Sequence, residues 1–136
     1  MELNLKKYSL AVLASGLWIN ISEFTRNELF IKELWIKGFQ RMGLDFPSAP
    51  LNGVIWGLWA FIFAGALALL CSKFTAISSA FIAWVTGFVL LWIAMWNMGV
   101  LPSKIIFWAA PWSFFEVLIA AFICSKLLKD KLLTGH

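Results

Sequence analysis

Residues 51–71 read LNGVIWGLWAFIFAGALALLC, an apolar segment that carries no charged side chain. A helix of about 20 such residues is long enough to cross the hydrocarbon core of a bilayer. Pro50 precedes the segment and Lys73 follows it, so both ends are marked. The segment is continuously apolar rather than alternating, and it therefore predicts a transmembrane helix and not a strand of a membrane β-barrel.

Three further apolar segments lie around this one, at about residues 8–24, 76–98 and 105–125. The first of them follows Lys6 and Lys7 and has no small-residue cleavage site, so we expect a retained span rather than a signal peptide. The sequence thus predicts an all-α membrane protein built as a four-transmembrane-helix bundle. Residues 1–136 are expected to form a single integral membrane domain.

The composition of the chain excludes several classes of protein. Of its 136 residues 62% are hydrophobic and 13% are charged, whereas soluble domains are nearer half apolar and a quarter charged. The cysteines are Cys71 and Cys124, the histidine is His136, and these spacings match no usual zinc site. The net charge of +4 comes from residues at the ends of apolar segments rather than from a basic stretch. We therefore expect no metal, no cofactor and no nucleic acid, and membrane lipid as the surroundings.

The segment between the first two spans has a different pattern. At 100° per residue, one half of a helix over about residues 27–42 is mostly apolar, and Glu33, Lys37 and Gln40 lie opposite. Gly43 and the following prolines end this pattern. It predicts an interfacial amphipathic helix between spans 1 and 2, with a plain polar loop as the alternative.

The basic residues predict the orientation of the chain. One side of the membrane would hold Lys6, Lys7, Lys73, Lys126, Lys129 and Lys131. The other side would hold Arg26, Lys32, Lys37, Arg41 and Lys104, which are mixed with acidic residues. We expect the first side, with both termini, to be cytoplasmic. The chain resembles small four-span proteins of the bacterial inner (cytoplasmic) membrane, which implies that location.

Small residues form stripes on two of the predicted spans. On the second span the stripe consists of Gly53, Gly57, Ala60, Ala64 and Ala68. The third span carries Ala76, Ala80, Ala83, Gly87 and Ala94. Such stripes let helix backbones approach closely in lipid. They fit internal packing of one bundle, and they also fit the contact face of a homodimer.

Amide, acidic and tryptophan side chains gather toward one predicted membrane level, the outer one. The polar members of this group are Asn20, Glu23, Asn52 and Asn97. Its aromatic members include Trp56, Trp59, Trp92, Trp96 and Trp112. One interpretation is an aromatic belt at the lipid headgroups. The other is an outward-facing cavity that binds amphipathic or cationic molecules by stacking and cation–π contact.

Glu116 is the most informative single residue. It lies near the middle of the fourth predicted span, where an ionisable group is costly and indicates function by default. Trp112 and Ser113 share its helix face, and Pro111 leaves the carbonyl of Phe107 without its helical donor. The alternative role for Glu116 is structural, as a carboxyl that bonds to Asn97 or Ser113 between helices.

These patterns predict a membrane protein that binds or transports a small amphipathic molecule, with Glu116 as its protonatable centre. The alternative is a non-catalytic accessory or scaffold subunit that packs through its small-residue faces. We expect no enzyme activity, because no nucleophile lies beside a base in any span. Arg26 and Glu23 are interpreted as an ion pair at the membrane interface that anchors a helix end.

Overall fold

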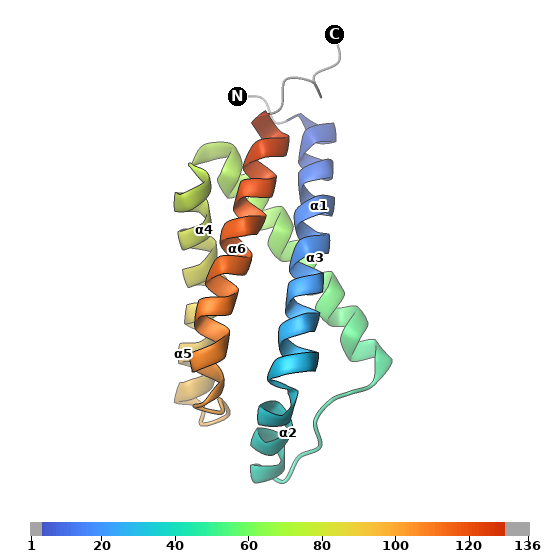
Figure 1. Cartoon of the computed structure of the whole chain (residues 1–136), viewed down its shortest axis with the longest axis vertical. Helices are drawn as coiled ribbons and strands as arrows, with labels where there is room; N and C mark the ends of the chain where they lie inside the picture. The colour runs from blue at the N-terminus through green and yellow to red at the C-terminus, as the bar shows by residue number, and fades with distance from the viewer. Residues whose placement is uncertain (1–3, 130–136) are drawn as a thin grey trace.

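The computed structural model describes residues 4–129, and these form a bundle of helices that contains no strand (Figure 1). The predicted all-helical architecture is confirmed for this range. The elements are α1 (Leu5–Phe24), η1 (Thr25–Phe30), α2 (Lys32–Arg41), α3 (Pro50–Lys73), α4 (Ala76–Trp84), η2 (Val85–Val89), α5 (Leu90–Asn97) and α6 (Ile105–Lys129). The segments η1 and η2 are wide π-helical turns, and α4, η2 and α5 follow one another without a break.

Local sequence signals explain where the helices begin and end. Asn4 caps α1, because its side chain accepts a hydrogen bond from the backbone N–H of Lys7 at 3.2 Å. Thr75 caps α4 in the same way, and Pro50 occupies the first turn of α3, where its missing N–H costs nothing. Gly43 and Gly99 follow α2 and α5 with φ of 71° and 72°, a conformation that favours glycine.

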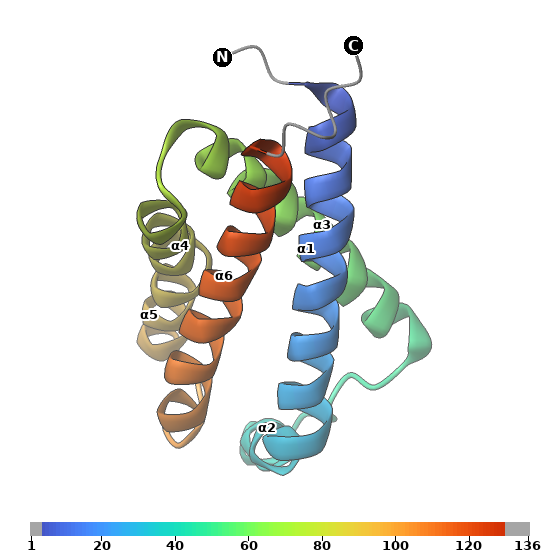
Figure 2. The same cartoon turned by 45° about the horizontal axis from the view of Figure 1, so that its top comes forward.

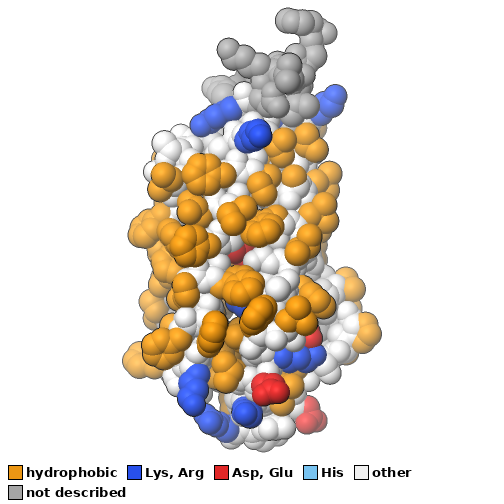
Figure 3. All heavy atoms as spheres, in the orientation of Figure 1, with side chains coloured by type: hydrophobic (Ala, Val, Ile, Leu, Met, Phe, Trp, Pro, Cys, Tyr) orange, Lys and Arg blue, Asp and Glu red, His pale blue; other side chains and the backbone are white. Residues whose placement is uncertain are grey.

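Three helices of the described chain are long and apolar enough to cross a membrane, which indicates an integral membrane protein. They are Pro50–Lys73, Ala76–Asn97 and Ile105–Lys129, with mean hydropathies of 2.3, 2.0 and 1.8. The helix α1 is not among them, because lysines, Asn20 and Glu23 interrupt its apolar sequence. On the face that Figure 3 shows, apolar side chains cover the middle of the molecule, and most charged side chains lie toward its two ends.

The helices pack through small side chains. The helix α1 contacts both α3 and α6, and α6 also contacts α3 and α4. The helix α3 crosses behind α1 and α6 (Figures 1 and 2). Ala60, Ala64 and Ala68 of α3 are buried within the bundle, so this part of the predicted stripe serves internal packing. Gly53 differs, since a Cβ atom there would meet no described atom within 4 Å.

The segment after α1 differs from the predicted helix over about residues 27–42. The chain continues from α1 into the η1 turn and breaks at Ile31, and α2 begins only at Lys32. Ile31 is buried against Ile105 and Ala109 of α6, so burial of this one side chain stops the regular helix. All side chains of α2 remain at least partly exposed, although Leu34 and Trp35 pack against the cluster of Ile31 and α6.

We predict that Gly16→Leu destabilises the fold, because any Cβ atom at Gly16 would overlap the ring of Phe61 on α3. Overpacking of this kind costs about 1–3 kcal/mol. The control is Gly53→Leu, which enters open space and gains up to about 1 kcal/mol of helix propensity. Thermal unfolding of the purified variants in detergent measures both. Equal midpoints for the two variants would show that α1 and α3 do not pack closely at Gly16.

Candidate functional site

Glu116 lies in the interior of the bundle, halfway along α6. Its side chain is 1% exposed, and Ser22, Glu23 and Arg26 face it from α1 and η1. Neither of its carboxyl oxygens has a hydrogen-bond partner among residues 4–129. A buried polar group without a partner costs about 1–3 kcal/mol. The alternative role of Glu116 was a structural hydrogen bond to Asn97 or Ser113. Within the described chain neither of these bonds is formed.

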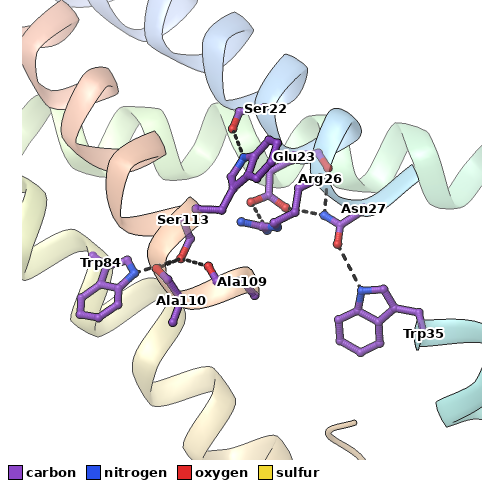
Figure 4. A network of polar contacts seen from close by, with 10 residues as sticks. Ser22, Glu23, Arg26, Asn27, Trp35, Trp84, Ala109, Ala110 and Ser113 are labelled. Atoms are coloured by element: carbon purple, nitrogen blue, oxygen red, sulfur yellow. Dashed lines mark hydrogen bonds and ion pairs between the residues drawn. The ribbon is translucent and has the colours of Figure 1, made fainter. Parts of the chain in front are cut away.

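Beside Glu116 lies a buried ion pair between Glu23 and Arg26 (Figure 4). The Arg26 guanidinium donates from Nη2 to Glu23 Oε1, and Asn27 Nδ2 donates to Glu23 Oε2 at 2.9 Å. The guanidinium also lies over the ring of Phe88, with Cζ 5.8 Å from the ring centroid. Arg26 Nε and Nη1 have no acceptor within the described chain. The guanidinium thus pairs with Glu23, and Glu116, the second carboxyl group of the cluster, forms no ion pair with it.

The structure adds burial to the predicted Arg26–Glu23 pair. Spacing predicted an anchor at the membrane interface, and within the bundle Arg26 is 5% and Glu23 is 9% exposed. Arg26 lies in η1, the π-helical turn that continues α1, and its side chain points toward Glu23 (Figure 4). The exposed pair of the segment is Lys32 with Glu28, whose side chains are 38% and 36% exposed.

Tryptophan indole groups connect the helices around this site. Each indole N–H donates to an acceptor on another element, which fixes the ring in one orientation. The bonds are Trp18 to the Glu116 carbonyl at 3.0 Å, Trp112 to Ser22 Oγ at 2.9 Å, Trp84 to Ser113 Oγ at 3.0 Å and Trp35 to Asn27 Oδ1 at 3.2 Å. These tryptophans therefore position the polar cluster, a role that a lipid-facing aromatic belt does not explain.

An apolar pocket of about 390 Å³ lies between α1 and α6. Its walls are Trp18, Ile21, Trp112, Phe115 and Ile119, and its polar lining is Ser22, Thr25 and Glu116. On this face Figure 3 shows a small acidic area recessed among apolar side chains. The pocket opens sideways on the apolar belt of the molecule, so its contents would exchange with lipid rather than with water.

The structure brings together part of the predicted site. Glu116, Trp112 and Glu23 belong to one cluster. Trp59 and Trp92 lie on the other side of Phe88, with ring centroids 5.7 Å and 5.8 Å from its ring. The Asn20 side chain donates to the Gly16 carbonyl at 2.9 Å.

The remaining predicted residues lie away from Glu116. Trp56 and Trp96 are 58% and 71% exposed, Asn97 is exposed and Asn52 is partly buried. None of these four lines the pocket beside Glu116. The outward-facing cavity of aromatic and amide groups, as the sequence indicated it, is therefore not the pocket that contains Glu116.

Sequence reasoning missed Arg26, Ser22 and Asn27 as members of this site. A signal was present, because Ser22, Glu23 and Arg26 lie within four positions at the end of an apolar segment. Spacings of three and four place Glu23, Arg26 and Asn27 on one helix face. The sequence did not reveal the π-helical turn, which decides whether that face points into the bundle or toward solvent.

The arrangement can bind a proton or a cationic group at one carboxyl. The residues described contain no group of three or more His, Cys, Asp or Glu side chains that could hold a metal ion. Glu23 is bonded by Arg26 and Asn27, whereas the Glu116 oxygens are buried beside Ser22 and Glu23 and accept no hydrogen bond within the described chain. Aromatic rings beside it suit a cation through their negative faces. Comparison with protein-family models, curated proteins and solved structures finds no match to the chain.

We predict that Arg26→Met alone destabilises the protein strongly, because it leaves Glu23 buried without its counter-charge. Breaking a buried pair on one side costs about 3–5 kcal/mol. The double variant with Glu23→Gln should lose much less than the sum of the two single variants. Unfolding of the four proteins in detergent gives this coupling.

The matched control is the exposed pair, through Lys32→Met and Glu28→Gln. These changes should shift stability by no more than about 1 kcal/mol, because solvent screens the pair. Strictly additive losses at Glu23 and Arg26 would show that their ion pair does not hold η1 in place.

Proposed function

We propose that this chain is a non-catalytic membrane protein that binds or transports a small amphipathic molecule in the pocket between α1 and α6. The observation that carries the proposal is Glu116, a buried carboxyl whose oxygens have no partner in the described chain and which lines that pocket. An ionisable group inside a membrane bundle indicates function by default. The apolar walls would hold the tail of the molecule, and Glu116 would meet its polar end.

The charges around Glu116 favour a cationic head group. The groups that face it are Glu23 and Arg26, whose formal charges cancel. An ionised Glu116 therefore leaves the cluster with one negative charge, which either a proton or an ammonium group would neutralise. Because both occupy the same carboxyl, proton binding and ligand binding would compete.

We further propose that α1 is the fourth span. It runs beside α6 and contacts α3 along the bundle, although its own sequence is less apolar (Figure 2). Inside the bundle its polar residues are satisfied by neighbours, as Glu23 is by Arg26. Lysines at the end of the bundle that holds Lys7 and Lys126 would place that end in the cytoplasm of a bacterial cell. Lys131, which also supports this orientation, lies outside the described residues.

A further part of the proposal concerns assembly. A homodimer would enlarge the pocket, and Gly53 offers an open position on α3 for a close helix contact. The competing function is a scaffold subunit without a ligand. That function would require a filled interior with Glu116 bonded; the ligand-binding proposal is supported instead by the pocket that Glu116 helps to line and by the absence of a hydrogen bond to its oxygens within the described chain.

Ligand-induced thermal stabilisation tests the proposal. The probes are an alkylammonium ion, the alcohol of the same chain length and the matching carboxylate. We expect the ammonium probe to stabilise the wild type most, by about 2.7 kcal/mol at a hundredfold excess over Kd. Its effect should grow from mildly acidic to mildly alkaline pH, because the proton that competes for Glu116 is then removed.

Three variants make the result specific. Glu116→Gln removes the charge and should abolish the ammonium effect, and Ile119→Trp should reduce it by filling the pocket. Glu33→Gln is the control, because it removes an exposed carboxyl of α2. A response that is equal for ammonium and alcohol, or unchanged in Glu116→Gln, contradicts the proposed site. No response to any probe, with Glu116→Gln equally stable at every pH, favours the scaffold.

A further inference from the structure

A second polar cluster lies in the bundle, toward the end that holds the lysines. Cys71 of α3 and Cys124 of α6 are free thiols, 2% and 0% exposed, and they contact each other. Cys71 Sγ donates to the carbonyl of Ala121 at 3.6 Å, and Cys124 Sγ lies 3.2 Å from Ser15 Oγ. Cys124 follows Glu116 by two turns of α6, or about 12 Å, so this cluster is separate from the pocket.

Hydroxyl groups surround the two thiols. Ser79 of α4 and Ser125 of α6 lie against Cys71, and both are more than nine-tenths buried. Their Oγ atoms have no hydrogen-bond partner among the described residues. The helices α1, α3, α4 and α6 thus each contribute a sulfur or hydroxyl group to this cluster. Buried polar atoms without partners are costly, and their convergence indicates a ligand.

The chemistry of the cluster selects the ligand. Thiolate sulfur is a soft donor and prefers soft ions such as Cu(I). A structural zinc site takes four ligands, but within residues 4–129 no third His, Cys, Asp or Glu joins the two cysteines. A monovalent soft ion needs fewer donors. Binding would remove one proton from each thiol and form two metal–sulfur bonds without any change of oxidation state.

The charge of such a complex is also accommodated. Two thiolates and one monovalent cation carry a net charge of −1. The ammonium group of Lys129 lies near enough to Cys71 to act on it electrostatically, and it would offset this charge. The hydroxyls of Ser79 and Ser125 would donate hydrogen bonds to the sulfur of Cys71, as outer partners of metal ligands commonly do.

We propose that Cys71 and Cys124 form a buried site for one soft monovalent metal ion, Cu(I) or its redox-inert analogue Ag(I). The site draws on residues that the pocket at Glu116 does not use. Its occupancy would tie α3 to α6 and would stabilise the folded bundle by linkage.

Equilibrium dialysis of the full chain in detergent tests the site. Reduced protein is dialysed without oxygen or chloride against Ag(I) buffered by a competing chelator, and bound silver is counted by mass spectrometry. We expect one ion per chain and a raised thermal midpoint. Cys71→Ser and Cys124→Ser should each abolish binding at the same chelator concentration.

Two more measurements separate ligation from a change in folding. Ser79→Ala keeps both thiols and should weaken binding by about 10–100-fold, whereas Ser72→Ala removes a hydroxyl bonded to the Leu69 carbonyl and should not. X-ray absorption at the silver edge on the wild type should show two sulfur neighbours. Silver that binds equally to Cys71→Ser, or an edge spectrum of oxygen and nitrogen neighbours, would overturn the site.

Discussion

The burial of Arg26 beside Glu23 is the constraint on which the rest of the candidate site depends. A guanidinium and a carboxylate are expensive to bring out of water, and here each is the counter-charge of the other where α1 passes into η1. The same turn places Asn27 where it bonds both Glu23 and the indole of Trp35. A single local distortion therefore orders one end of α1, the start of α2 and the charges that Glu116 faces.

This arrangement leaves the Glu116 carboxyl without a hydrogen-bond partner inside an apolar bundle, among the residues that the structure describes. Glu23 is bonded by Arg26 and Asn27, and it also lies close enough to Glu116 to act on it electrostatically. Trp18 and Trp112 are held by their own hydrogen bonds, and they wall a pocket at which the Glu116 carboxyl lies almost completely buried. Most polar groups of the cluster thus form hydrogen bonds that hold the structure, whereas the oxygens of Glu116 accept none within the described chain.

The sequence predicted the parts of the fold that follow from continuous apolar patterning. The helices over 50–73 and 105–129 contain the predicted spans 51–71 and 105–125. The depth of Glu116 was also readable, because it follows from position along one helix. The features that could not be predicted depend on the direction in which each helix turns its side chains. A π-helical turn changes the direction in which Arg26 points, and the burial of Ile31 depends on α6, far away in sequence.

The same limit applies to the tryptophans. Sequence places Trp56, Trp59, Trp92 and Trp96 at similar depths, but depth alone does not bring residues together. The helix α3 crosses behind α1 and α6 at an angle (Figure 1). Its first turns lie at the edge of the bundle, whereas its buried residues lie from its middle onward. Trp59 remains in contact with Phe88, whereas Trp56, one turn earlier, is largely exposed. Because close packing needs small residues, the alanines of α3 and Gly57, which lies against Asn20 of α1, decide where the helices meet, whereas Gly53 faces open space.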